Sequence, residues 1–182
     1  ELLDDLHNLT RLVEDLRLLS LSEAGQLKVE LQQVDLAAML RQLHQTYQPV
    51  AQQLQLEFEL QLQDALVLAD PLRLRQVISN LLDNAFKYGA AGRRIHLSLQ
   101  PAGSDWQLLV TDQGPGIQAK PVELVFERFY RDPGHGKQQG SGLGLAICKQ
   151  LTELMQGHIS VQSEVGKGSS FSLRLPAVSV IS

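Results

Sequence analysis

The amino-acid sequence predicts an α/β two-layer sandwich, in which helices cover one face of a mixed β-sheet and one amphipathic helix precedes the sandwich. Two observations predict this fold class. Short segments in which apolar and polar residues alternate, the pattern of a half-buried strand, take turns along the chain with longer segments of helical periodicity. The length of 182 residues suits one globular domain with an appendage.

The composition excludes several classes of function. Hydrophobic residues make up 43% of the chain and charged residues 20%, which is ordinary for a folded domain. The formal net charge of −4 provides no basic surface, so we expect no nucleic acid partner. No apolar run approaches the roughly 18 residues that a membrane span needs, and no signal peptide is visible. The single cysteine, Cys148, excludes an internal disulfide and lies in an apolar segment, which predicts a buried side chain.

The first segment, residues 1–22, predicts one amphipathic helix. Its apolar residues follow alternating spacings of four and three, which is a heptad pattern. The residues of this pattern are Leu2, Leu6, Leu9, Val13 and Leu16, and the face is widened by Leu3, Leu12 and Leu19. About three heptads are marginal for an isolated coiled coil, so we expect packing in a bundle. An ordinary core helix would show the same stripe. We favour an interaction helix, because the segment lies outside the α/β pattern that follows.

Strands and a helix alternate over the next part of the chain. Residues 27–34 and 54–62 predict two strands, and residues 66–68 predict a short third strand. Between the first two strands, Asp35 or a neighbour begins a helix that is expected to run to about residue 52.

The next helix contains the most informative residues of the sequence. Asp70 is a good N-cap before a proline, and a glycine follows Tyr88, so we expect the helix to run between these two residues. Asn80 and Asn84 lie four residues apart and therefore on one helical face, close to an apolar stripe. A buried amide without a partner costs about 1–3 kcal/mol. The pair is therefore either two satisfied core amides or a polar site that suits a hard cation and a phosphate.

The remaining elements alternate strands, a glycine-rich segment and one helix. In order, the sequence predicts a strand at 95–99, a turn at 101–104, a strand at 106–111, a segment rich in Gly, Pro and charge at 113–142, a helix at about 143–155, and strands at 159–161 and 170–175.

Three further motifs carry chemistry, and each is a weak signal alone. Asp112-Gln113-Gly114-Pro115-Gly116 puts a carboxylate at a strand end before alternate glycines, which let backbone approach a flat ligand closely. Gly140-Ser141-Gly142-Leu143-Gly144-Leu145 opens a helix, where free N–H groups favour phosphates. Between them, Phe126-Glu127-Arg128-Phe129-Tyr130-Arg131 adjoins a flexible basic loop, which suits a lid over a charged ligand or an anchored surface loop.

These motifs follow Asn80-Leu81-Leu82-Asp83-Asn84-Ala85-Phe86-Lys87-Tyr88 in an order that resembles the catalytic and ATP-binding domain of sensor histidine kinases. That family lies within the wider gyrase and heat-shock chaperone ATPase superfamily. The asparagine segment resembles its asparagine box, and residues 126–131 resemble its phenylalanine box. Residues 112–116 and 140–145 resemble its two glycine boxes. The resemblance covers about residues 34–176 and implies a Bergerat-type ATP-binding fold with ATP and Mg²⁺ as cofactors.

The resemblance implies a role for each matching residue. Asn84 would bind the magnesium ion, with Asn80 helping to hold the metal or the phosphates, and Lys87 would contact phosphate. Asp112 would accept a hydrogen bond from the adenine amino group. The residues assigned to catalysis are Asn80, Lys87 and Arg131. The other residues assigned to the nucleotide are Tyr88, Gly114, Gly116, Ile117, Phe129, Gly140, Ser141, Gly142, Leu143, Gly144 and Ser169. The segment from about Ile117 to Gly140 would be a mobile lid, with Arg128 and Lys137 as further candidate phosphate contacts.

A histidine kinase also needs a phosphoacceptor histidine, which the family places before an acidic residue and a short Arg-Thr-Pro stretch. His7 is followed by Asn8, and no such stretch occurs in the chain. We therefore expect His7 to be exposed and this fragment to bind ATP without phosphorylating itself. The resemblance implies that residues 1–25 are the second helix of the dimerisation domain, residues 26–36 a linker and first strand, and residues 37–178 the catalytic domain.

The resemblance also implies partners and alternatives. The partners would be the protein's own dimerisation domain, in a homodimer, and a response regulator that receives the phosphoryl group on an aspartate. The chain would be a cytoplasmic part of a longer protein, held in the bacterial inner membrane by upstream segments. A hydrolysing ATPase clamp of the superfamily would carry a glutamate where this chain has Asn80, an amide that takes no proton at neutral pH. A nucleotide-binding pseudokinase module stays open, although the intact motifs argue against it.

Overall fold

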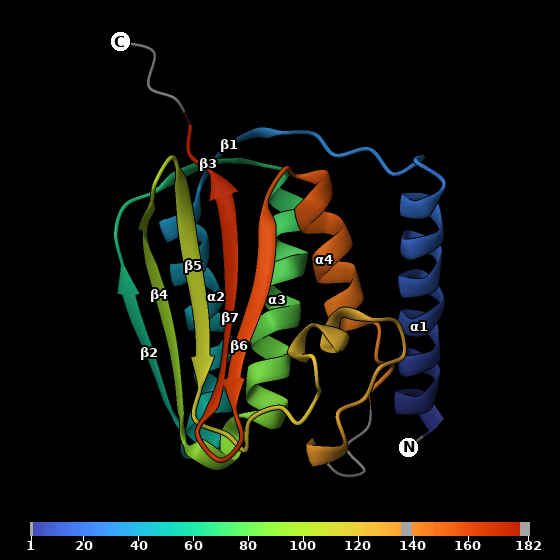
Figure 1. The fold of residues 1–182 in the computed structure, drawn as a ribbon, viewed down its shortest axis with the longest axis vertical. Coiled ribbons are helices and arrows are strands. Elements are labelled where there is room, and N and C mark those ends of the chain that lie inside the picture. The colour runs from blue at the N-terminus through green and yellow to red at the C-terminus, as the bar shows by residue number, and fades with distance from the viewer. Residues whose placement is uncertain (1, 136–139, 179–182) are drawn as a thin grey trace.

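A five-stranded sheet forms one layer of the molecule in the computed structural model, which describes residues 2–135 and 140–178 (Figure 1). Its spatial order is β2 (Glu57–Leu62), β4 (Arg94–Ala102), β5 (Asp105–Asp112), β7 (Gly168–Pro176) and β6 (His158–Glu164). β2 pairs with β4 in parallel, and the other neighbours pair antiparallel. The sheet is therefore mixed, as predicted.

Helices α2 (Leu36–Gln53), α3 (Pro71–Tyr88) and α4 (Gly144–Leu154) form the second layer on one face of the sheet (Figure 1). Strand residues alternate in burial as a one-sided sheet requires. In β4, Ile95, Leu97 and Leu99 are buried against the helices, whereas His96 and Ser98 between them are only half-buried. The predicted two-layer sandwich is confirmed.

Side-chain caps begin the two longest helices of this layer, as expected. Asp35 Oδ1 accepts a hydrogen bond from Ala38 N at 2.9 Å at the start of α2. Asp70 Oδ1 accepts from the first turn of α3, and its Oδ2 accepts from Glu30 N at 2.9 Å. Asp70 therefore satisfies free N–H groups of α3 and also holds the incoming chain against that helix end.

The first strand is shorter than predicted. β1 (Gln32–Asp35) pairs antiparallel with β3 (Leu66–Ala69) in a separate two-stranded sheet, and residues 27–31 form no strand. Leu27, Val29 and Leu31 are nevertheless partly buried against the core. The alternation of apolar residues was thus a correct signal of one-sided burial, but β3 is too short to pair with this part of the chain.

Two other boundaries differ from the sequence-based expectation. β2 begins at Glu57 because α2 continues to Gln53 and a turn with Gln55 at φ 54° follows it. The β4–β5 hairpin is longer than predicted, since Pro101 pairs with Trp106 inside the ladder. Strand β2 reaches only as far as Leu99 on the other side of β4, so Pro101 removes no donor from a ladder there.

Helix α1 (Leu2–Glu23) stands outside the sandwich, alongside α4 (Figure 1). Leu18 and Leu19 are buried, whereas most of the predicted heptad residues are exposed, with Leu2 at 84%, Leu6 at 60% and Val13 at 59%. His7 is exposed, as expected. None of the described helices has the length and apolar character that a bilayer crossing requires.

The last turn of α1 is fastened by polar contacts. Ser22 Oγ donates to Gln150 Oε1 on α4 at 3.0 Å, and Glu23 forms an ion pair with Arg128. Arg128 was predicted as a candidate phosphate contact; its guanidinium pairs with Glu23 of α1, and a role with phosphate stays a prediction.

The described residues between β5 and α4 include two short 3-10 helices, η2 (Val122–Phe126) and η3 (Pro133–His135). Val125 and Phe126 are buried, and the Phe126 ring meets the Phe171 ring edge to face at 6.2 Å. The segment is therefore anchored in the core through the phenylalanine motif. The predicted contact Lys137 lies outside the described residues.

Candidate nucleotide-binding site

A cavity of about 690 Å³ opens between α3, the segment after β5, the N-terminus of α4 and helix α1. This volume is in the range of small-molecule sites, about 300–1,000 Å³. It is lined by most of the residues that the sequence predicts for the nucleotide, namely Asn80, Asn84, Lys87, Tyr88, Asp112, Gly116, Ile117, Arg131, Gly140, Ser141, Gly142, Gly144 and Ser169. Motifs that are separated by up to about 90 residues in the sequence therefore meet around one space.

Three predicted residues are not part of the lining. Leu143 is fully buried in the core, and Phe129 is 59% exposed. Gly114 packs against the end of α3, where an added Cβ would lie 2.8 Å from the Cα of Gly89. Their assignment to the nucleotide stays a prediction.

One end of the cavity is built on strand ends and carries Asp112, the last residue of β5, which is only 8% exposed. Its Oδ1 accepts a hydrogen bond from Gly114 N at 2.9 Å. Ser169, on the neighbouring strand β7, pairs with Asp112 in the register and also lines the cavity. A buried carboxylate beside a hydroxyl can recognise the amino group of a flat heterocycle. We call this region the base end.

Ser163 holds the base end together. Its Oγ accepts from Ile117 N at 2.8 Å, donates to Gly168 O at 3.0 Å and lies 2.9 Å from Ser169 Oγ. A hydroxyl has one donor and two acceptor sites, so Ser169 is the donor in the last contact. Every hydrogen-bonding site of Ser163 is thus used.

The first glycine motif has a packing reason in addition to any ligand approach. Gly116 adopts φ +76°, and an added Cβ would collide with the carbonyl oxygen of Glu164. Pro115 O accepts from Gly166 N at 2.8 Å in the same place. Glycine is required at 116 because two backbones meet there in a left-handed conformation.

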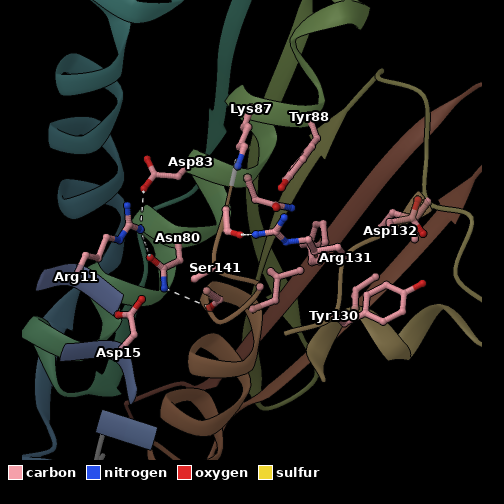
Figure 2. A pocket seen from close by; sticks show the side chains of 18 of the residues that line it. Arg11, Asp15, Asn80, Asp83, Lys87, Tyr88, Tyr130, Arg131, Asp132 and Ser141 are labelled. Carbon is pink, nitrogen blue, oxygen red and sulfur yellow. Dashed lines mark hydrogen bonds and ion pairs between the residues drawn. The ribbon is translucent and has the colours of Figure 1, made fainter. Parts of the chain in front are cut away.

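The opposite end of the cavity gathers amides, cations and the glycine-rich loop, and we call it the phosphate end (Figure 2). Asn80 Nδ2 donates to Gly144 O at 3.2 Å, which joins α3 to the first turn of α4. Lys87 Nζ lies 2.8 Å from where a Cβ of Gly140 would be, so the glycine leaves room for the ammonium group. Arg131 donates to the same residue's carbonyl oxygen.

Several lining residues were not predicted as site residues. Asp132 is buried and accepts from Gln118 N at 3.0 Å, which shapes the segment after β5. Val125, Tyr130 and Phe171 lie in or beside segments that were already singled out. The remaining unpredicted residues are Asp83 and Leu145 and, from α1, Asp5, Asn8, Leu9, Arg11, Leu12 and Asp15. No motif in the sequence indicates that α1 contributes to this cavity.

The donors at the phosphate end fit a cation that arrives with a nucleotide. Among the described residues, no group of three or more His, Cys, Asp or Glu side chains is arranged to hold a metal ion. Asn80 and Asn84 offer amide oxygens instead. Magnesium usually takes one or two protein oxygens together with phosphate oxygens and water, so these residues suit Mg²⁺ only in the company of a phosphate group.

A sandwich with a buried carboxylate at one end of its cavity, and amides, cations and a helix N-terminus at the other, defines a nucleotide-binding protein. Residues 69–179 match the family model described as histidine kinase-, DNA gyrase B- and HSP90-like ATPase, and the chain belongs to this family. The resemblance to the histidine kinase ATPase domain, inferred from four motifs, is confirmed.

Sensor histidine kinases are among the relatives. RcsC of Escherichia coli K12 is 38% identical over 174 residues, which are 92% of this chain and 18% of RcsC. The alginate biosynthesis sensor protein KinB of Pseudomonas aeruginosa is 34% identical over 175 residues, which are 95% of this chain and 29% of KinB. The chain therefore spans less than a third of either protein.

Solved structures with the same fold include the histidine kinase AdeS of Acinetobacter baumannii, with a TM-score of 0.82 and 30% identity over 98% of this chain and 83% of that one. Full-length ShkA in complex with AMPPNP has a TM-score of 0.83 and 29% identity, over 96% of this chain and 37% of that one. Both matches include α1 in addition to the sandwich, since they cover nearly the whole chain.

Proposed function

We propose that this chain is the catalytic part of a sensor histidine kinase and transfers the γ-phosphoryl group of Mg-ATP to a histidine of a dimerisation domain. The phosphoryl group would then pass to an aspartate of a response regulator. The longer protein would be a homodimer held in the bacterial inner membrane, with this part in the cytoplasm.

The observation that carries the proposal is the residue at position 80. Four motifs converge on one cavity, which supports ATP binding, and hydrolysing members of the superfamily would have a glutamate where this chain has Asn80. An amide cannot take a proton from water at neutral pH. The Nδ2 group of Asn80 also donates a hydrogen bond to Gly144 O at 3.2 Å, which links α3 to α4. Transfer to an imidazole rather than to water is thus favoured over a hydrolysing clamp.

The chain's own residues would bind and orient the nucleotide. Asp112 would accept the adenine amino group at the base end, while Asn84 and Asn80 would hold Mg²⁺. Lys87 and Arg131 would neutralise phosphate charge, since both line the phosphate end. When bound, Mg-ATP supplies the transferable phosphoryl group, and positioning together with charge neutralisation accounts for most of the catalysis in such transfers.

Helix α1 would be the second helix of the dimerisation domain. In support, Leu2, Leu6 and Val13 of the heptad pattern are 84%, 60% and 59% exposed, which leaves an apolar face for a partner helix. Residues 32–36 belong structurally with the sandwich, because β1 pairs with β3 and Leu36 is buried. The linker proper would then be residues 24–31.

The test is phosphoryl transfer in trans. The 182-residue chain is mixed with a separately prepared dimerisation domain of a related kinase that contains its histidine, and with ATP labelled at the γ-phosphate. We expect acid-labile label on the added domain, none on this chain alone, and none when the histidine of the added domain is replaced by alanine.

Three results would contradict the proposal. Label on this chain alone would mean that it contains its own acceptor. Steady release of inorganic phosphate without any labelled histidine would instead indicate the hydrolysing clamp. Nucleotide binding without either reaction would leave the pseudokinase module as the better description.

A further inference from the structure

We propose that Arg11, on helix α1, binds the terminal phosphate of the nucleotide and distinguishes a triphosphate from a diphosphate. The inference rests on the proposed function, because it takes the cavity to be an ATP site. It assigns to α1 a part in nucleotide recognition in addition to packing against another helix.

The guanidinium of Arg11 lies between two oxygens of α3 at the mouth of the cavity (Figure 2). Arg11 Nη2 is 3.5 Å from Asn80 Oδ1 and 3.6 Å from Asp83 Oδ2. Charge-assisted hydrogen bonds are usually about 2.7–2.9 Å long. The side chain is also 56% exposed. Arg11 is therefore placed at the site but only loosely bound there.

Its position belongs to the phosphate end and not to the base end. The Asn80 amide that faces Arg11 also donates to Gly144 O, in the first turn of α4. A helix N-terminus entered by a glycine-rich loop is where phosphates bind. Arg11, Lys87 and Arg131 thus line one end of the cavity from three different elements. A planar guanidinium can bind two oxygens of one phosphate group at once. Its present partners, the amide oxygen of Asn80 and one carboxylate oxygen of Asp83, each offer a single oxygen.

Two sets of contacts hold Arg11 at this place. Leu19 is 1% exposed and Ser22 bonds to Gln150, so the C-terminal half of α1 is fixed on α4. On the other side, Tyr47 Oη donates to Asp83 Oδ1 at 2.6 Å, which holds Asp83 with its second oxygen toward Arg11.

Arg11 offsets the negative charge of carboxylates that also line the cavity, so a terminal phosphate is expected to depend on it. Asp5 and Asp15 of α1 line the same cavity as Asp83. Burial raises the pKa of the Asp15 carboxyl, with Arg11 opposing this effect. Without the guanidinium, a terminal phosphate beside Asp83 and Asp15 would lose the cation that offsets these carboxylates, whereas inner phosphates held by Lys87 and Arg131 would be affected less.

Calorimetric titration of the 182-residue chain, with magnesium, would test the proposal using AMPPNP and ADP as the two probes. We expect Arg11→Ala to weaken AMPPNP binding about tenfold and ADP binding less than twofold, as for loss of one charged hydrogen-bonding group. Arg11→Lys keeps the charge without the two-pronged geometry, so an intermediate loss is expected. Arg17→Ala is the matched control, because Arg17 is the other arginine of α1, is exposed and does not line the cavity.

Each other outcome overturns the proposal in a recognisable way. Equal weakening of both probes would make Arg11 a general structural or electrostatic contributor. Stronger binding of both probes by Arg11→Ala would make the contact a latch that closes the site. Normal binding by the unsubstituted chain with no effect of Arg11→Ala would overturn the role of Arg11 alone, whereas failure of the unsubstituted chain to bind either probe would overturn the proposed function as well.

Discussion

The two ends of the cavity are built in different ways. The base end rests on the strands β5, β6 and β7, and its groups are buried and joined by short contacts, such as the 2.8 Å bond from Ile117 N to Ser163 Oγ. The phosphate end is assembled from α1, α3 and the segment before α4, and its contacts with α1 are long and exposed, as at Arg11.

This difference indicates that the two ends of the cavity contribute differently to ligand binding. A base end whose polar groups already have partners does not need to reorganise when a ligand binds, so it can supply constant affinity for the base. A phosphate end held by weak contacts can change its arrangement at little cost, so it can respond to the number of phosphates and to the metal. The predictions below separate the two ends by the ligand that each one recognises.

The largest effect is expected at the phosphate end, from Asn84→Ala. Loss of its amide oxygen should weaken AMPPNP binding in the presence of magnesium by about 100-fold, because metal affinity falls by up to about this factor when a supporting group is removed. Binding measured in EDTA should change little. Gln76→Ala is a control on the same helix, since Gln76 does not line the cavity. Equal losses with and without magnesium would break the comparison, because Asn84 would then not act through the metal.

A smaller and uniform effect is expected at the base end, from Asp112→Asn. The amide removes the negative charge that would accept the adenine amino group, and loss of a charged hydrogen bond costs about tenfold in affinity. The loss should be the same for AMPPNP and ADP, with or without magnesium, when each is titrated by calorimetry. A loss confined to the triphosphate would contradict the assignment of Asp112 to the base.

The smallest effect on binding is expected from Ser163→Ala, which acts on the framework of the base end. Three partners lose a shared hydroxyl, so the free energy of unfolding in urea should fall by about 1–3 kcal/mol, while nucleotide affinity should change only a few-fold. Ser160→Ala, on the same strand, is the control. If Ser163→Ala left stability unchanged but abolished binding, the base end would not be the preformed region described above.

Much of the fold and of the base end could be predicted from the sequence, because the signals are local. Asp35 and Asp70 begin helices through their own side chains, and residues 112–116 combine a strand end with two glycines in five positions. Strand ends were less predictable. Residues 27–31 alternate like a strand and are partly buried, but pairing depends on the length of β3, which is not a property of residues 27–31.

The contribution of α1 to the cavity could not be predicted, because the dominant pattern of that helix describes its other face. Most of the heptad residues, such as Leu2, Leu6 and Val13, are exposed and indicate where a partner helix would pack, whereas Leu9 lines the cavity. The face toward the cavity carries Asp5, Arg11 and Asp15, which in the sequence look like ordinary solvated charges. The packing of α1 against α4, where Ser22 bonds to Gln150, helps to set which of these side chains reaches α3.

The single cysteine provides a chemical probe of the packing between α3 and α4. Cys148 Sγ is fully buried between α4 and α3, 3.5 Å from Val77 O, and burial raises the pKa of its thiol to about 12. The thiolate is the form that attacks a thiol reagent, so this buried, protonated side chain does not react while the two helices stay together. The rate at which a thiol reagent modifies Cys148 therefore reports how often α3 and α4 separate. The hydrogen bond from Asn80 to Gly144 joins these two helices at the phosphate end.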